Sequence, residues 1–506
     1  MSHPATTTPR IPEADESDSV LAALRSPRRL RTEVLGGLVV ALALIPEAIS
    51  FSIIAGVDPR LGLFASFTMA VSIAFLGGRP AMISAATGAI ALVIAPVARE
   101  YGVDYLLATV ILGGLIQVVL GVLGIARLMR FVPRSVMVGF VNALAILIFL
   151  AQLPHLRDVP WAVYPLVAVG LVIVFGLPRL SNVVPAPLVA IVLLTAFTVT
   201  AAVTVPTVGD EGELPESLPA LLFPDVPLTL ETLQIIAPFA LAMAVVGLLE
   251  SLMTAKLVDD ITDTHSNKTR ESWGQGAANV ITGFFGGMGG CAMIGQTMIN
   301  VKASGARTRI STFLAGVFLL ALVVGLGDLV AIIPMAALVA VMILVAISTF
   351  DWHSVRPSTL RRMPRSETAV MLATVVVTVV SHNLAYGVGV GVLVAMVAFA
   401  RRVAHLTTVT RLDASDDDAQ RVYAVTGELF FASSNDLVYQ FDYAGDPREV
   451  VIDLSGAHIW DASTVAALDA ITTKYASKGK TVTIRGLDPD SARRHERLAG
   501  QLGGGH

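Results

Sequence analysis

Two carboxylates stand in the middle of apolar stretches of the sequence. Glu47 lies within residues 34–55, directly after Pro46, and Glu250 lies within residues 234–255. An ionisable side chain inside a bilayer is costly, about 2.5 to 3.5 kcal/mol even on the lenient insertion scale, so such a residue normally lines a pathway or pairs internally. We predict a transport role for both carboxylates. The plainer alternative is a protonated carboxyl bonded to neighbouring backbone.

Two short stretches rich in small residues, 84–98 and 293–302, are alike. Each follows a double glycine and places a polar residue beside glycine: Phe75-Leu76-Gly77-Gly78 leads to Thr87-Gly88-Ala89, and Phe284-Phe285-Gly286-Gly287 leads to Gly295-Gln296-Thr297. Two alignments are open, one of Gly78 with Gly287 and one of Ala81-Met82-Ile83 with Ala292-Met293-Ile294. Either alignment indicates an internal repeat.

Paired, glycine-interrupted segments are typical of inverted-repeat transporters, whose broken helices point their ends at a site in the middle of the membrane. A helix N-terminus offers unpaired N–H groups and roughly half a positive charge, which suffices to hold an anion. Taken alone, each stretch fits equally well with small residues that permit close helix packing. Their pairing favours an anion-binding site.

Membrane helices must position these residues. The chain of 506 residues is 54% hydrophobic and only 15% charged, with a mean hydropathy of +0.73, which excludes a water-soluble protein. A helix needs about 20 apolar residues to cross a bilayer, and fewer if it is broken and packed inside protein. Roughly fourteen segments meet this condition, with approximate bounds at residues 34–55, 62–76, 84–98, 105–125, 136–152, 161–177, 185–206, 234–255, 271–288, 293–302, 311–327, 330–350, 367–382 and 385–400.

Basic residues follow the even-numbered segments, as expected for cytoplasmic loops. Examples are Arg79, Arg134, Arg179, Lys268, Lys302, Arg361 and Arg401. The longest odd-numbered loop carries Asp210, Glu211, Glu213 and Glu216 and is predicted to be extracytoplasmic. Residues 1–33 lack the apolar core of a signal peptide and are predicted to be a cytoplasmic tail. Both termini of a multi-pass bacterial inner-membrane protein are therefore expected in the cytoplasm.

A different pattern follows the predicted transport domain of residues 34–402. We expect a linker at 403–410, a soluble cytoplasmic α/β domain at 411–500 and a disordered glycine-rich tail at 501–506. Within the soluble domain, residue periodicity predicts strands at 422–431, 450–454 and 481–485 and a helix at 463–474.

Other functional classes find little support in the sequence. The net charge is only -4 and the basic residues are dispersed, so no nucleic-acid partner is expected. Cys291 is the single cysteine, which excludes an intrachain disulfide and a thiolate metal cluster. No nucleotide-binding loop, metal-ligating cluster or catalytic triad occurs in the soluble part. We therefore predict a transporter without a cofactor rather than an enzyme.

Several strings resemble the sulfate permease (SulP) family of anion transporters and exchangers, over nearly the whole chain. They are Ile45-Pro46-Glu47-Ala48-Ile49-Ser50-Phe51-Ser52, Phe131-Val132-Pro133-Arg134-Ser135-Val136-Met137-Val138-Gly139-Phe140, Val208-Gly209-Asp210, and Gly295-Gln296-Thr297-Met298-Ile299-Asn300 followed by Gly305-Ala306-Arg307-Thr308-Arg309. The C-terminal unit is similar to the STAS domain that ends these transporters, through Gly427-Glu428-Leu429-Phe430-Phe431, Val451-Ile452-Asp453-Leu454-Ser455 and Asp461-Ala462-Ser463-Thr464.

This resemblance implies an all-α membrane domain of fourteen segments in two inverted repeats of seven, with a mobile core domain, a gate domain and commonly a homodimer. The first to fourth and eighth to eleventh segments would form the core, with the anion between the broken third and tenth helices. Six residues would then surround the anion, Thr87, Gly88, Ala89, Gly295, Gln296 and Thr297, and three would border the same pocket, Glu47, Phe51 and Glu250.

The chain departs from the family pattern at three positions. Many relatives have glutamine where Glu47 stands and tyrosine where Phe51 stands, and vertebrate and plant members commonly have arginine where Gln296 stands. The pocket is therefore more acidic and lacks a fixed positive charge. Anion binding must rest on helix ends or on a co-transported cation.

The leading hypothesis is proton-coupled symport of a small mono- or dianion by alternating access. Protonation of Glu47 or Glu250 would remove the repulsion between that carboxylate and the anion. Sodium is the alternative coupling ion, since Glu250 and Thr254 lie one helical turn apart and could supply oxygen ligands. An exchanger, a channel-like facilitator and a membrane-anchored STAS signalling protein stay open. So does the substrate among sulfate, bicarbonate, chloride and small dicarboxylates.

Ser463 stands where related anti-sigma-factor antagonists carry a phosphorylated serine. A serine at the start of a helix is first an N-cap, worth about 1 kcal/mol, and we predict that role here. A cytoplasmic regulatory partner of the STAS-like domain also stays open.

Overall fold

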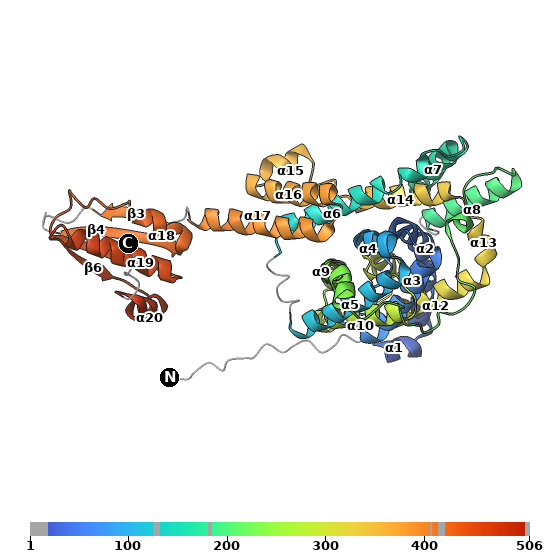
Figure 1. The fold of residues 1–506 in the computed structure, drawn as a ribbon, viewed down its shortest axis with the longest axis horizontal. Helices are drawn as coiled ribbons and strands as arrows, with labels where there is room; N and C mark the ends of the chain where they lie inside the picture. The colour runs from blue at the N-terminus through green and yellow to red at the C-terminus, as the bar shows by residue number, and fades with distance from the viewer. Residues whose placement is uncertain (1–18, 125–131, 181–184, 405–406, 413–419, 501–506) are drawn as a thin grey trace. The chain divides into compact units, whose positions relative to one another are not determined.

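The computed structural model describes residues 19–124, 132–180, 185–404, 407–412 and 420–500 (Figure 1). Its contacts divide the chain into two compact units, residues 1–392 and 393–506. Parts of the predicted N-terminal tail and linker lie outside the described residues, as do Phe131 and the whole predicted tail 501–506.

The helices of the first unit pack into two groups. In the first helix group, α5 contacts α9 and α10, while α12 contacts α2 and α3. Two short strands, β1 and β2, precede α4 and α11. The elements of this group are α1 (Val20–Arg25), α2 (Pro27–Ala55), α3 (Pro59–Leu76), β1 (Ser84–Ala85), α4 (Gly88–Tyr101), α5 (Val103–Val122), α9 (Leu230–Thr262), α10 (Lys268–Phe284), β2 (Cys291–Ala292), α11 (Ile294–Met298), the π-helical turn η5 (Ile299–Ala303) and α12 (Arg309–Gly325).

In the second helix group, α6 contacts α16 and α14, and α14 also contacts α7 and α8. Its elements are α6 (Arg134–Leu150), η3 (Pro154–Leu156), α7 (Val163–Leu180), α8 (Ala186–Thr200), η4 (Val208–Glu211), α13 (Gly327–Ala331), α14 (Met335–Thr349), α15 (Pro357–Arg362), α16 (Arg365–Ser381) and the start of α17 (Leu384–Ala404). Two helices of the first group contact the second group. Helix α2 contacts α8 and α14, and helix α4 contacts α6.

Each predicted membrane segment overlaps a helix of the structure. Among the described residues, six helices are long and apolar enough to cross a bilayer, namely α2, α3, α5, α6, α9 and α17. The shorter apolar helices α7, α8, α12 and α14 accompany them. Helices α4 and α11 each begin shortly after a two-residue strand.

The helices differ from the approximate membrane segments at several bounds, and three of these differences have local reasons. Residues 84–85 form β1, so the third helical segment begins at Gly88. Helix α2 begins at Pro27, earlier than predicted, because proline fits the first turn of a helix. Residues 330–350 do not form one helix, since Pro334 caps α14 and the separate helix α13 precedes it.

Helices α5 and α10 approach each other through their backbones. A Cβ at Gly276 would lie 2.6 Å from the Gly114 carbonyl oxygen, and a Cβ at Gly114 would lie 2.8 Å from the Val280 nitrogen. A larger residue at either position would push the helices apart. This contact holds α10, and the chain that leads from it to β2, against α5.

The second unit contains an α/β domain. Its sheet has the order β3-β4-β5-β6, in which β3 is antiparallel to β4 and the other neighbours are parallel. Strand β6 has the predicted bounds, whereas β3 begins inside the predicted linker. The elements are β3 (Thr408–Leu412), β4 (Gln420–Leu429), α18 (Phe431–Leu437), β5 (Glu449–Ile459), α19 (Ala462–Ala476), β6 (Thr481–Arg485) and α20 (Pro489–Leu498).

The N-cap of α19 is Asp461. Its backbone is extended, with φ of -141°, and its carboxylate accepts the Thr464 N–H at 3.1 Å. Ser463 lies in the first helical turn with an exposed side chain. The predicted N-cap role of Ser463 is therefore wrong, because the carboxylate of Asp461 already has the cap geometry.

A buried carboxylate, Asp446, joins two tyrosines in the core of the α/β domain. Tyr423 donates to it at 2.8 Å and Tyr475 at 2.5 Å. Both tyrosines pack in the hydrophobic core of this domain. Burial, and after it the hydrogen bond to Asp446, raises the pKa of Tyr475. Its hydroxyl therefore stays protonated and needs an acceptor.

We expect Asp446→Ala to destabilise the α/β domain by about 2 to 3 kcal/mol, because two buried hydroxyls lose their acceptor. Hydrogen exchange of the β4 and β5 amides in the purified full-length protein should become faster. Tyr439→Phe is the control, since the Tyr439 side chain is 83% exposed. Equal exchange rates in Asp446→Ala and the wild type would contradict a supporting role for this network.

Candidate functional site

The two predicted breaks meet in an antiparallel pair of two-residue strands. Ser84 of β1 pairs with Ala292 of β2, and Ala85 pairs with Cys291. A helix begins shortly after each strand, α4 after β1 and α11 after β2. Since the strands are antiparallel, the two helices leave from opposite ends of the pair, and both N-termini point back towards it.

Helix α4 begins with an N-cap at Thr87. The Thr87 hydroxyl oxygen accepts the Ile90 N–H at 3.3 Å. Phe51 of α2 covers this helix start, since a Cβ at Gly88 would lie 2.9 Å from the Phe51 ring. The first amides of a helix, here those of Gly88 and Ala89, have no partner within it. Four predicted site residues therefore lie together at the start of α4.

Helix α11 opens to free space at Gly295. Apart from its chain neighbours and the backbone of its own helix, no described atom lies within 4 Å of the position of a Gly295 Cβ, although the next residues, Gln296 and Thr297, are buried. The Gln296 side chain hydrogen-bonds the carboxyl of Glu47 on α2. The Thr297 hydroxyl accepts the Ile83 N–H at 3.0 Å, so it fastens α11 to the chain before β1 rather than facing the open space.

Glu250 reaches the same strand pair from α9. The Cys291 thiol donates to Glu250 Oε2 at 3.0 Å, and the Cys291 sulfur lies 3.2 Å from the Thr87 hydroxyl oxygen. Glu250 is only 8% exposed and Cys291 is fully buried. One turn along α9, Thr254 donates its hydroxyl proton to the Glu250 carbonyl at 2.8 Å. A continuous chain of polar groups thus joins Glu250 to the N-cap of α4.

The predicted site residues form two linked sets, one near each end of the strand pair. Glu250 is linked to Thr87, whereas Glu47 is linked to Gln296. Thr87 is the N-cap of α4 and Met293 is the N-cap of α11, so these two residues hold equivalent positions. Neither of the two sequence alignments places them opposite each other. The place of Cys291 in this site was not predicted from the sequence. The available signal was its position within the small-residue stretch that leads to Gly295.

Two further buried carboxylates hold backbone of neighbouring loops. Glu271 of α10 accepts the Gly78 N–H at 2.7 Å and the Arg79 N–H at 2.9 Å. Glu33 of α2 accepts the Thr308 N–H at 3.0 Å, at the start of α12. Neither residue was predicted from the sequence to have a role. Both show the structural use of a buried carboxylate, since both accept several backbone N–H groups.

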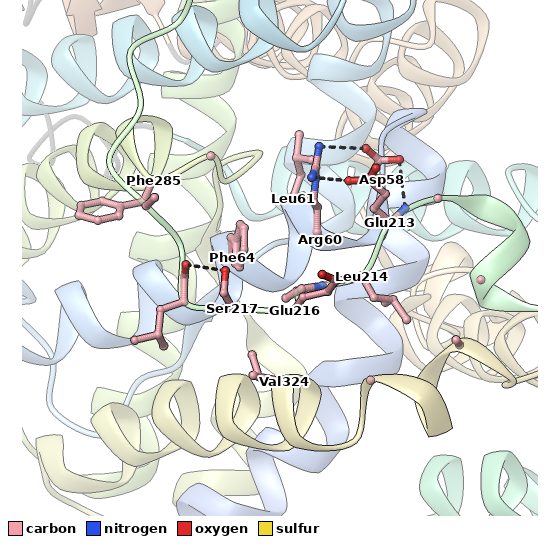
Figure 2. A pocket seen from close by; sticks show the side chains of 18 of the residues that line it. Asp58, Arg60, Leu61, Phe64, Glu213, Leu214, Glu216, Ser217, Phe285 and Val324 are labelled. Atoms are coloured by element: carbon pink, nitrogen blue, oxygen red, sulfur yellow. Dashed lines mark hydrogen bonds and ion pairs between the residues drawn. The ribbon is translucent and has the colours of Figure 1, made fainter.

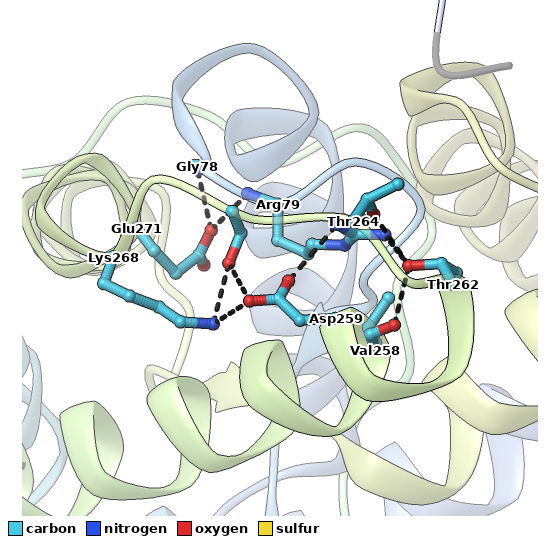
Figure 3. Close-up of polar contacts among 9 residues, drawn as sticks. Gly78, Arg79, Val258, Asp259, Thr262, Thr264, Lys268 and Glu271 are labelled. Carbon is cyan, nitrogen blue, oxygen red and sulfur yellow. Dashed lines mark hydrogen bonds and ion pairs between the residues drawn. The ribbon is translucent and has the colours of Figure 1, made fainter. Parts of the chain in front are cut away.

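The Arg79 side chain lies in a polar cluster next to these contacts (Figure 3). Its guanidinium lies 3.2 Å from Asp259 and donates to Thr262 at 2.7 Å and to Thr264 at 2.6 Å. Lys268 lies 2.7 Å from the other Asp259 oxygen. The cluster joins the loop after α3 to the end of α9 and the start of α10. It therefore holds α9, which carries Glu250, against the loop that leads to β1.

A cavity of about 1380 Å³ lies under the loop between α8 and α9 (Figure 2). Its lining includes Asp58, Arg60, Asp210, Glu213 and Asp328. The Arg60 guanidinium lies 2.5 Å from the Glu213 carboxylate, so the acidic loop is fastened to the start of α3. None of the predicted site residues lines this cavity, which is therefore separate from the two helix starts.

Comparison with known proteins gives matches over both units. The model of the sulfate permease family matches residues 30–164 and 155–374, and the model of the STAS domain matches residues 391–500. YbaR of Bacillus subtilis, a protein inferred to be a sulfate transporter, is 53% identical over 462 residues. That match covers 91% of this chain and 95% of YbaR.

Two solved structures are similar as well. The transmembrane domain of the cyanobacterial bicarbonate transporter BicA superimposes with a TM-score of 0.64 at 26% identity, covering 71% of this chain and 98% of that one. The murine anion transporter Slc26a9 in its inward-facing state gives a TM-score of 0.79 at 16% identity, covering 92% and 87%. The second likeness is one of fold and includes the α/β domain.

Proposed function

Since the chain belongs to the sulfate permease family and is a multi-pass membrane protein with a C-terminal STAS domain, we propose that it is a secondary active transporter of a small anion, driven by protons. One observation carries this proposal. The starts of α4 and α11 flank one strand pair, and each has a buried carboxylate nearby, Glu250 through Cys291 and Glu47 through Gln296.

The helix starts are the proposed anion ligands. The first amides of α4, and those of α11 with the π-helical turn that continues it, carry partial positive charge. The contacts described for Thr87, Gly88, Gly295 and Gln296 include no lysine or arginine side chain. We place the anion in the open space at Gly295. YbaR and BicA are named for sulfate and bicarbonate, so we propose an oxyanion of that kind, with small dicarboxylates as the wider class.

Coupling to protons follows from charge. An anion that enters beside an ionised Glu250 or Glu47 is repelled, and the low dielectric of a buried site strengthens that repulsion. Protonation of the carboxyl removes it. A proton and an anion therefore bind more favourably together than apart, which is the requirement for symport.

The two helix groups suggest how the site changes sides. We propose that the first helix group moves as the core domain of an elevator against the second, the gate domain. The two broken helices, β1 and β2 all belong to the first group, so the anion would travel with it. Two inverted repeats and a homodimer, expected from the family, belong to the same proposal.

Uptake into proteoliposomes tests the function directly. Purified protein should concentrate labelled sulfate or labelled bicarbonate above the level of empty vesicles when the outside is acidic, and should not do so without a gradient. Equilibration without accumulation under every gradient would indicate a facilitator, and accumulation only against an anion loaded inside the vesicles would indicate an exchanger. Large unitary currents without concentrative uptake would indicate a channel.

Sodium coupling is the second candidate. Glu250 and Thr254 lie one turn apart, and the Thr254 hydroxyl oxygen keeps lone pairs after it donates its proton to the Glu250 carbonyl. Carboxylate and hydroxyl oxygens are suitable ligands for a hard cation. Uptake that follows an imposed sodium gradient at equal pH on both sides would favour this candidate over proton symport.

The STAS domain is proposed to regulate transport rather than to select the anion. We expect a chain that ends before residue 407 to change uptake rate or stability but to keep the same order of preferred anions. A domain outside the helical part cannot line the site at the strand pair. Competition among unlabelled anions measures the order, and an altered order would contradict the prediction. If the full chain carries no anion but its STAS domain still binds a protein partner, a signalling function is favoured.

Orientation rests on the basic residues of the even-numbered loops. We expect both termini in the cytoplasm. A reporter enzyme that is active only in the periplasm should therefore be inactive when fused after Arg402, and active when inserted beside Glu216. The reverse pattern would contradict the predicted topology.

A further inference from the structure

We propose that Cys291 relays the protonation state of Glu250 to the hydroxyl of Thr87, and so decides whether Thr87 can donate a hydrogen bond to the anion. The inference rests on the proposed proton-coupled transport. It adds a positioning residue between the proton site and the anion site. The chain of contacts is Glu250 Oε2 to Cys291 Sγ at 3.0 Å and Cys291 Sγ to Thr87 Oγ1 at 3.2 Å.

Donor and acceptor counts limit how these contacts can be made. A threonine hydroxyl has one proton and two lone pairs, and one lone pair of Thr87 already accepts the Ile90 N–H. Its contact with Cys291 is possible with either atom as the donor. The thiol has a single proton. Cys291 can therefore donate to Glu250 or to Thr87, but not to both.

Ionised Glu250 fixes one direction of the chain. Its oxygens can only accept, so the thiol proton points to Glu250, and the Thr87 hydroxyl proton points to the sulfur. Protonated Glu250 permits the opposite direction. Its O–H donates to the sulfur, the thiol proton turns to the Thr87 oxygen, and the Thr87 proton is released towards the start of α4. Glu250 takes up one proton from solution, while the thiol and hydroxyl protons stay on their own atoms.

Few other ionisable groups can act on Glu250. Among the described residues, the ionisable side chain in contact with it is Cys291. The elements packed against α9 are α4, α5, α10, α11 and β2, and α11 has none of its own. The other ionisable side chains of α9 and of the helices packed against it lie towards the helix ends. They are Arg99, Glu100 and Tyr101 on α4, Asp104 and Tyr105 on α5, Lys268, Arg270 and Glu271 on α10, and Glu231, Lys256, Asp259 and Asp260 on α9. Glu47 on α2 bonds Gln296 instead.

Two substitutions separate the relay from simple packing. Cys291→Ser keeps one proton and two lone pairs at this position, whereas Cys291→Val is of similar size and has no polar group. The test uses the full-length protein in proteoliposomes, with labelled sulfate and labelled bicarbonate as probes. It measures KM and kcat of uptake at acidic and alkaline external pH.

The wild type and Cys291→Ser should bind the anion more tightly at acidic pH. Cys291→Val has no acceptor for the Thr87 proton, so its KM at alkaline pH should be about tenfold below that of the wild type, as for the gain of one hydrogen bond to a charged group, while its KM at acidic pH should equal that of the wild type. Its kcat should change less than its KM. Cys291→Ala replaces Cys291→Val if gel filtration shows that the valine variant does not fold.

Three outcomes overturn the relay in distinguishable ways. A Cys291→Val protein with the pH profile of the wild type shows that Cys291 carries no signal. The same lowered alkaline KM in Cys291→Ser shows that the residue at position 291 acts through packing alone. A wild type whose uptake does not depend on protons overturns the proposed coupling itself, and the relay with it.

Discussion

Glu250→Gln should abolish proton-driven accumulation while leaving anion binding measurable. For one proton per anion, a gradient of one pH unit corresponds to about 1.4 kcal/mol, or tenfold accumulation. Glutamine imitates the protonated carboxyl permanently, so the anion meets no repulsion at any pH and no proton needs to enter with it. The variant should equilibrate labelled anion across the membrane, and accumulation should no longer follow the pH gradient. Parallel uptake assays of wild type and variant measure this.

Two control substitutions test whether Glu250 or Glu47 is the carboxylate that couples transport to protons. Glu250→Asp keeps the titratable group and should recover part of the coupling. Glu47→Gln removes the other buried carboxylate, which bonds Gln296 rather than Cys291, and should have the smaller effect. If Glu250→Gln still concentrates anion while Glu47→Gln does not, the roles are reversed. If neither substitution matters and sodium alone drives uptake, cation ligation by Glu250 and Thr254 becomes the better account.

Gly295→Leu should reduce uptake to the level of empty vesicles without preventing folding. Outside its own helix and chain neighbours, no described atom lies within 4 Å of a Cβ at this position, so the Cβ meets no clash and the leucine side chain extends into the space proposed for the anion. Gly88→Leu should also abolish uptake for a different reason, because its Cβ would meet Phe51 at 2.9 Å and Ile148 at 3.1 Å. Labelled-anion uptake and gel filtration of each variant separate loss of transport from loss of fold.

Gly176→Leu is the matched control for Gly295→Leu. Gly176 also lies in a helix, α7, and its Cβ would likewise meet no described atom within 4 Å, but α7 belongs to the second helix group. This variant should transport like the wild type. Normal uptake by Gly295→Leu would place the anion elsewhere.

The parts of the site that were predictable have a local signal in the sequence. Glu47 and Glu250 stand out because a carboxylate in an apolar stretch is rare, and the breaks stand out because glycine interrupts a hydrophobic run. The pairing of Ala85 with Cys291 has no such signal. Two-residue strands are too short to show a period, and their partner lies far away in the chain.

The roles of individual polar side chains were the least predictable feature. Thr297 and Thr254 have hydroxyls that suit a ligand, yet both are engaged with backbone in the structure. Cys291 looked like an isolated thiol because its partners, Glu250 and Thr87, come from other elements. Asp461 and not Ser463 is the N-cap of α19, since backbone conformation rather than residue type decides which side chain reaches the first amides of the helix.

The strand pair β1–β2 also bears on how such a protein could diversify. Backbone hydrogen bonds connect the two strands, and these do not depend on the identity of the side chains around them. Residues 47, 51 and 296 can therefore be exchanged while the amides at both helix starts keep their places. A lineage could acquire a new preference among anions by a few substitutions, without passing through an ancestor whose binding site has to be rebuilt.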